Sequence, residues 1–167
     1  MPGINQAGTE QEGIRQATRW GTQAAHFATD FAWVFWFGGL TFYMAVVVPI
    51  GGDIIGSDVQ GEITSVVTGH LNWASITAAS LMLVRGWTQE SKLVLWSAMS
   101  ILLTTILLIW LRDQLLDRMD GAPLVTAAND QWLSDWSFYS IHRIYLWTTT
   151  IQWLFGLMPL VYSRTKP

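Results

Sequence analysis

Four long runs of apolar residues dominate the pattern of the chain, and short polar segments separate them. The runs cover Phe27–Ile50, Ile63–Val84, Leu93–Leu111 and Trp136–Tyr162. A helix needs about 20 apolar residues to cross the hydrocarbon core of a bilayer, and each run has roughly that length. The pattern therefore predicts an all-α membrane protein folded as a four-transmembrane-helix bundle.

The residues that flank these runs indicate where the helices begin and end. Pro49, followed by Gly51 and Gly52, predicts that the first spanning helix stops there, because proline and glycine interrupt helical hydrogen bonding. Small and apolar residues between Ile14 and Ala24 recur at helical spacing, which predicts a short N-terminal interfacial helix. The third run is expected to continue past the membrane as a helix over Leu111–Asp120.

These elements predict three parts of the chain. Residues 1–26 form a polar tail with the interfacial helix, residues 27–162 form the four-span membrane domain, and residues 163–167 form a C-terminal tail. The expected orientation follows the excess of Lys and Arg in cytoplasmic loops. Both termini are therefore expected on the cytoplasmic side of a bacterial-type inner membrane. Six of the nine basic residues fall on that side: Arg15, Arg19, Arg85, Lys92, Arg164 and Lys166. Arg143 opposes this orientation.

Composition supports the membrane prediction and excludes several functional classes. Only 13% of residues are charged, against about 25% in ordinary soluble domains, and the mean hydropathy is +0.31. The 11 Trp residues fit an aromatic belt at the membrane interfaces. The net charge of −3 argues against nucleic acid as a partner, and the lack of cysteine excludes disulfides and thiolate metal sites. The usual hydrolase and nucleotide-binding motifs are also missing, so we do not expect an enzyme.

Polar residues within the predicted spans form stripes at helical spacing. One stripe in the fourth span contains His142, Tyr145, Thr149 and Gln152, and one in the second contains Asn72, Ser75 and Ala79. A third stripe, in the third span, contains Ser97, Ser100 and Thr104. Small and hydrogen-bonding residues are typical of helix contacts in membranes, so we interpret all three stripes as packing faces.

The histidines are the candidate binding residues. His70 and His142 are predicted at comparable depth on the outer side of the bundle, where two imidazoles can hold haem b axially or begin a copper or zinc site. The simpler interpretation is that each makes a separate hydrogen bond near the interface. His26 and Asp30 are spaced as an i, i+4 pair, which favours a hydrogen bond and also allows a proton relay. We expect no cofactor, with haem b or copper as the alternative.

Two short motifs suggest a family. The first span contains a glycine, aromatic residues and a closing V-x-P over residues 39–49, and the last span opens with F-x-x-x-H-R over residues 138–143. Residues 27–162 thereby resemble the small four-helix membrane proteins related to transmembrane protein 205 and to the copper-resistance D-type membrane domain. The resemblance implies the four-span fold, with Pro49 and His142 at corresponding positions, but no particular reaction.

The expected function is that of an accessory subunit. An apolar bundle without catalytic motifs fits a structural role, in which the chain contacts membrane lipid and packs against other membrane subunits or against a second copy of itself. The alternative is a haem- or metal-binding membrane module that uses His70 and His142.

Overall fold

The computed structural model describes residues 4–120 and 128–165, and every element in these two segments is helical. The elements are α1 (Ile4–Phe42), the π-helical turn η1 (Tyr43–Val47), α2 (Val48–Ile55), α3 (Ser57–Thr88), α4 (Lys92–Asp120) and α5 (Ala128–Thr165). Because α1, η1 and α2 follow one another without a break, they form one long helix, and the described chain has four long helices. The all-helical prediction is confirmed at the level of these elements, and residues 121–127, between α4 and α5, lie outside the described residues.

The first helix does not stop at Pro49, so the predicted end was wrong. The helix continues to Ile55 and ends at Gly56, whose φ of 83° is a conformation that glycine adopts readily. The π-helical turn explains the difference. Within it the backbone N–H of Val48 donates to the carbonyl of Tyr43, five residues earlier, and this wider turn comes immediately before Pro49. The shifted hydrogen bonding accommodates a residue that has no N–H of its own to donate.

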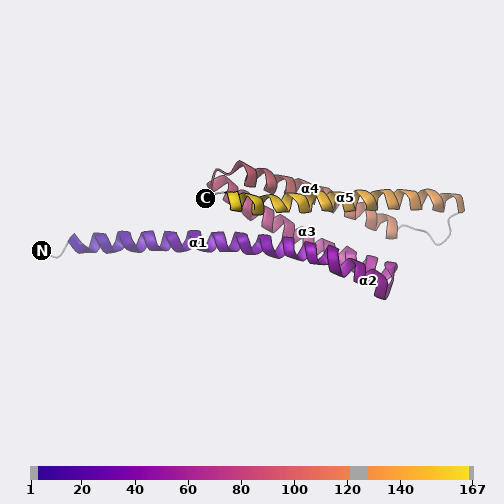
Figure 1. The fold of residues 1–167 in the computed structure, drawn as a ribbon, viewed down its shortest axis with the longest axis horizontal. Coiled ribbons are helices and arrows are strands. Elements are labelled where there is room, and N and C mark those ends of the chain that lie inside the picture. The colour runs from indigo at the N-terminus through magenta and orange to yellow at the C-terminus, as the bar shows by residue number, and fades with distance from the viewer. Residues whose placement is uncertain (1–3, 121–127, 166–167) are drawn as a thin grey trace.

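The N-terminal segment is helical, but it is not a separate interfacial helix. Helix α1 runs without interruption from Ile4 to Phe42, so the predicted interfacial helix is the first half of the same element. That half extends beyond the other helices (Figure 1), and residues 11–25 are exposed wherever their side chains are described. The remaining helices are close to the prediction, and α4 continues to Asp120 as expected.

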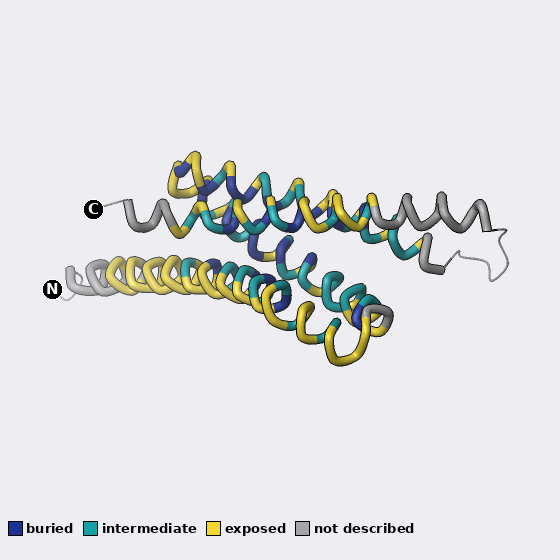
Figure 2. Tube along the Cα trace, turned by 45° about the vertical axis from the view of Figure 1, so that its right-hand side comes forward, coloured by how far each residue is buried: buried dark blue, intermediate teal, exposed yellow. Residues whose placement is uncertain are grey.

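Helix α4 packs along both α3 and α5, and the second half of α1 lies mainly against α3 (Figures 1 and 2). One core cluster contains Trp36, Leu40, Ala78, Ala79 and Ile101, and a smaller one contains Met82, Val94 and Ala98. Three of these eight residues are alanines, which allow neighbouring helices to approach closely. A tight turn joins α3 to α4, in which Ser91 donates its N–H to the carbonyl of Gly86 at 3.0 Å.

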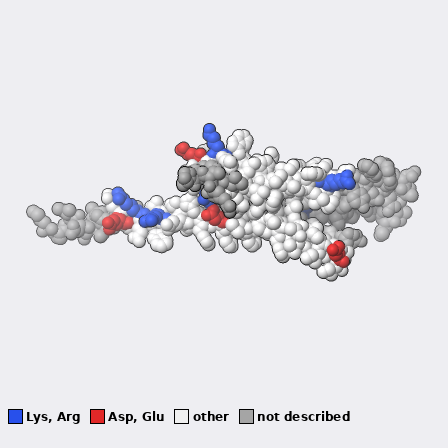
Figure 3. Space-filling model, viewed as in Figure 1, with Lys and Arg blue, Asp and Glu red and all other residues white. Residues whose placement is uncertain are grey.

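Large apolar side chains cover the outside of the bundle. Trp96 is 69% exposed and Leu103 is 70% exposed, and similar residues occur on all the long helices. The charged side chains gather instead around the two ends of the bundle, with an uncharged surface between them (Figure 3). Two helices are long and apolar enough to cross a membrane, within Gln11–Ile55 and Lys92–Asp117 of the described chain.

Candidate functional site

Three polar side chains form a cluster at the centre of the bundle, where α3, α4 and α5 meet. Gln152 donates from Nε2 to Ser75 Oγ at 3.1 Å and to Thr105 Oγ1 at 2.6 Å. The two hydroxyl oxygens of Ser75 and Thr105 are 2.8 Å apart. None of the three residues is more than 2% exposed. One polar cluster therefore joins three helices in the interior of the bundle.

The protons of this cluster can be assigned from hydrogen-bond counting. The hydroxyl of Thr105 donates to the carbonyl of Ile101 at 2.7 Å, and a hydroxyl has only one proton to donate. Ser75 must therefore be the donor in its contact with Thr105. Thr105 Oγ1 accepts two hydrogen bonds, one from Ser75 and one from Gln152, and donates one. Such bonds are strong away from water, and the loss of one partner is correspondingly costly.

A second polar cluster lies beside the π-helical turn. The buried Tyr43 donates its hydroxyl to Thr64 Oγ1 at 2.8 Å, and Thr64 donates to the carbonyl of Gln60 at 2.7 Å. Helix α2 passes very close to this group, since a Cβ atom on Gly51 would overlap with Gln60 Oε1. Tyr43 and Gly51 thus fix the approach of the first long helix to α3.

Helices α1 and α5 meet at an aromatic contact. Trp153 donates from Nε1 to Thr41 Oγ1 at 2.9 Å. The ring of Phe37 stacks between Trp33 and Trp153, with centroids 5.3 and 5.6 Å away. Gly156 provides the room for this stack, because a Cβ atom there would lie 2.7 Å from Phe37 Cδ2.

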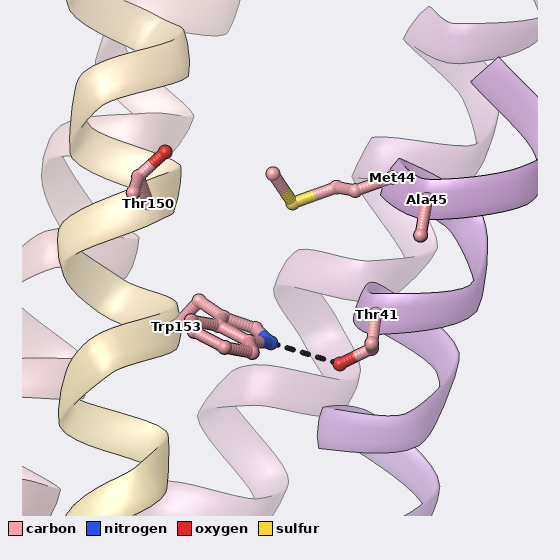
Figure 4. A pocket seen from close by; sticks show the side chains of 5 residues that line it. All are labelled: Thr41, Met44, Ala45, Thr150 and Trp153. Atoms are coloured by element: carbon pink, nitrogen blue, oxygen red, sulfur yellow. Dashed lines mark hydrogen bonds between the residues drawn. The ribbon is translucent and has the colours of Figure 1, made fainter. Parts of the chain in front are cut away.

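Two cavities adjoin this contact, and Met44 lines both of them. A groove of about 210 Å³ is lined by Thr41, Met44, Ala45, Thr150 and Trp153, and Figure 4 shows Met44 extending from the first helix toward α5. The second cavity measures about 80 Å³. It lies among η1, α3 and α5, and its polar lining residues are Tyr43, Thr64, Thr68, Asn72, Tyr145, Thr149 and Gln152.

Asn72 differs from the other polar residues of the second cavity. Its side chain is 6% exposed, and its Nδ2 atom has no hydrogen-bond partner among the described residues. Tyr43, by contrast, donates to Thr64 Oγ1, and Thr149 donates to the carbonyl of Tyr145 at 2.9 Å. A buried donor without a partner costs about 1–3 kcal/mol. Nδ2 of Asn72 is therefore a donor in the cavity wall that no side chain or carbonyl of the described residues satisfies.

Two arginine side chains contact neighbouring helices near the ends of the bundle. Arg85 on α3 forms an ion pair with Asp30 on α1, and both side chains are partly exposed. Arg112 on α4 donates from Nε to the carbonyl of Ser65 on α3 at 3.1 Å. These contacts join pairs of helices at opposite ends of the bundle.

The structure brings together four of the polar residues that the sequence singled out within the spans. They are Asn72, Tyr145, Thr149 and Gln152, which all line the second cavity. Ser75 and Ala79, which share the stripe of Asn72, are buried as well. Apart from the exposed His142, the stripes of the second and fourth spans therefore face each other in the interior.

The histidines are placed differently from this group. His70 is exposed, and its Nδ1 atom lies 3.0 Å from the carbonyl of Val66 in its own helix. His142 and Arg143 are exposed on α5. A haem or metal site inside the bundle requires both imidazoles in the interior, so the position of His70 and His142 gives that alternative no support. At the other end of the bundle, Asp30 pairs with Arg85 rather than with His26.

Sequence reasoning missed two residues that matter here. Thr105 was passed over for its neighbour Thr104, whose hydroxyl bonds only to carbonyls of its own helix, those of Ser100 and Ile101. Tyr43 was not recognised as a buried hydrogen-bonding residue. Its position in an otherwise apolar run was an available signal, because a buried tyrosine hydroxyl requires a partner.

No group of three or more His, Asp or Glu side chains within the described segments is arranged to hold a metal ion. Comparison with family models, with curated proteins and with solved structures finds no match to the chain.

Proposed function

We propose that the chain is an integral membrane protein that crosses a bacterial-type cytoplasmic membrane four times and serves there as a non-catalytic accessory subunit. The observation that carries this proposal is the reversed polarity of the bundle. Its centre holds the hydrogen-bonded cluster of Ser75, Thr105 and Gln152, whereas large apolar side chains cover its outside. A water-soluble bundle has the opposite arrangement, and exposed apolar surface on this scale indicates lipid or protein contact.

The spacing of charged residues supports four spans. Residues 31–52, 63–84, 93–111 and 144–163 contain no Lys, Arg, Asp or Glu, so each long helix has an uncharged stretch of 19 to 22 residues. At a rise of about 1.5 Å per residue, these stretches are roughly 30 Å long, which matches the hydrocarbon core. Helices α3 and α5 are the more polar pair, and their polar residues lie largely in the interior, where lipid does not contact them.

The proposed orientation rests on the basic residues at one end. Six of the nine Lys and Arg residues lie in the N-terminal half of α1, at the ends of α3 and α4 that adjoin their connecting turn, or at positions 164 and 166 of the sequence. The opposite end is rich in Asp and Glu. By the positive-inside rule, the basic end is cytoplasmic, and both termini lie on that side.

The accessory role rests on the exposed surface of α1. Phe27, Phe31 and Phe35 stack along one face with centroids 6.2 Å apart, and each is more than 60% exposed. Next to this face, residues 11–25 extend beyond the bundle with exposed side chains. An aromatic face that continues into a projecting helix suits contact with another membrane subunit or with a second copy of the chain.

The particle mass after extraction in a mild detergent tests this role. We expect a particle substantially heavier than one 18.8 kDa chain with its micelle. Substituting Phe27, Phe31 and Phe35 together by alanine should reduce it to the single chain. In a matched control, Leu103 and Ile106 on the exposed face of α4 are replaced in the same way, and the mass of the particle should not change. A monomer in several mild detergents would contradict the accessory role.

A further inference from the structure

Asn72 is the starting point for an inference about a ligand. Its amide offers one hydrogen-bond acceptor and two donors, and Nδ2 is buried without a partner among the described residues. Neighbouring hydroxyls have partners: Tyr43 donates to Thr64, and Thr149 donates to the carbonyl of Tyr145. The Nδ2 group of Asn72 is therefore a donor that no other residue of the described segments satisfies.

The chemistry of the cavity walls limits which ligand group can satisfy this donor. All residues that line the two cavities are uncharged, and half of those that line the smaller cavity, such as Trp36, Leu40 and Leu108, are apolar. Burying a charged group without a partner is far more costly than burying a neutral one that hydrogen-bonds. The occupant is thus neutral and carries a carbonyl or hydroxyl group. The volume of about 80 Å³ exceeds the roughly 10–15 Å³ that one water molecule needs.

The adjoining groove indicates where the rest of the molecule lies. Met44, which Figure 4 shows in the groove between the first helix and α5, also lines the smaller cavity, so the two cavities share this residue. The groove residues lie near the middle of the uncharged stretches 31–52 and 144–163. The exposed Ala45 forms part of its rim. At this depth in the proposed membrane, the groove faces hydrocarbon.

We propose that the cavity at Asn72 and the adjoining groove form one binding site for a neutral lipid, whose carbonyl or hydroxyl group hydrogen-bonds with the Asn72 amide and whose alkyl chain passes Met44 into the groove between α1 and α5. The π-helical turn contributes to the site because it carries both Tyr43 and Met44. The proposal requires the membrane location but no partner subunit, so it stands or falls separately from the accessory role.

Photolabelling of the full-length protein in phosphatidylcholine nanodiscs tests the site. The probe is a monoacylglycerol with a diazirine in the middle of its acyl chain, and labelled residues are mapped by mass spectrometry. We expect saturable labelling of Met44, Thr150 or Trp153 that unlabelled monoacylglycerol displaces. Labelling of Phe31 and Phe35 on the outer face of α1 reports contact with bulk lipid and should not saturate.

Two variants separate specific binding from lipid contact. Asn72→Leu removes the hydrogen bonds at similar volume and should weaken binding about three- to tenfold, the range expected for one lost hydrogen bond. Ala45→Trp fills the rim of the groove and should abolish the labelling of the groove residues. Val46→Trp, an exposed neighbour that does not line the groove, is the matched control and should label normally.

Three results would overturn the proposal. Equal labelling of Asn72→Leu and the unchanged protein would show that the amide binds nothing. Labelling confined to the outer face of α1 would show bulk lipid only. Equally strong groove labelling by a diazirine phosphatidylcholine would show that the site does not select a neutral lipid.

Discussion

Replacing Thr105 by valine tests the polar centre of the bundle with almost no change in shape. The variant keeps the β-branched side chain but removes the oxygen that accepts hydrogen bonds from Ser75 and Gln152. The Ser75 hydroxyl can turn to a carbonyl of its own helix, as serine in helices often does. One amide proton of Gln152 then has no partner in the interior.

The expected cost follows from these bonds. Hydrogen bonds between helices in membranes contribute about 0.6 kcal/mol on average, so two of them give a loss of about 1 kcal/mol. A stranded buried donor raises the loss toward about 3 kcal/mol. We therefore expect Thr105→Val to lower the free energy of unfolding by about 1–3 kcal/mol.

Thr77 provides a matched control. Its hydroxyl donates to the carbonyl of Trp73 at 3.0 Å, as that of Thr105 donates to Ile101, but Thr77 is exposed and its hydroxyl has no bond to another helix. Thr77→Val should change the free energy of unfolding by less than about 0.5 kcal/mol. Titration of the purified protein from mild detergent into dodecyl sulfate, followed by circular dichroism, measures both variants.

A double-mutant cycle makes the test sharper. Adding Gln152→Leu to Thr105→Val removes the stranded donor, so the double variant should lose less stability than the sum of the two single variants. Equal effects of Thr105→Val and Thr77→Val, together with strict additivity in the cycle, would refute the hydrogen-bonded cluster.

Two further predictions concern the contacts of α1. Gly156→Ala should destabilise the protein by about 1–3 kcal/mol, because its Cβ atom would lie 2.7 Å from the ring of Phe37; Gly38→Ala, which meets nothing within 4 Å, should be neutral or slightly stabilising in the same titration. Asp30→Asn should cost less than about 1 kcal/mol, and the difference from the unchanged protein should shrink with added salt, because the pair with Arg85 is partly exposed. A salt-independent loss would contradict that assignment.

The helices themselves could be predicted from the sequence because long apolar runs leave few alternatives. The continuation of α4 to Asp120 was predicted as well, from the spacing of its apolar residues. The end of the first helix was predicted wrongly. A proline such as Pro49 normally interrupts a helix, but the π-helical turn before it changes the hydrogen-bonding pattern. The pattern of apolar and polar residues does not reveal such a change.

The polar interior was predictable only in part. Spacing by three and four residues correctly grouped Tyr145, Thr149 and Gln152 on one side of α5. Adjacent residues on a helix point about 100° apart, so choosing between Thr104 and Thr105 requires knowing how α4 is rotated. The rotation of α3 likewise decides that His70 faces outward. Asp30 pairs with a residue 55 positions away, and only the packing of α1 against α3 reveals that contact.

Cysteine accessibility in intact cells tests the four-span membrane protein most directly, because the chain has no cysteine of its own. Single cysteines replace Gln89 and Lys166 at the basic end, Asp53 and Asp117 at the acidic end, and the exposed Leu103 between them. A membrane-impermeant maleimide should label Asp53→Cys and Asp117→Cys from outside, and should label Gln89→Cys and Lys166→Cys only after the cells are opened. Leu103→Cys should stay unlabelled in both cases, because lipid surrounds it. Labelling of Gln89→Cys and Asp53→Cys from the same side, or ready labelling of Leu103→Cys in the membrane, would contradict the proposed structure in the bilayer.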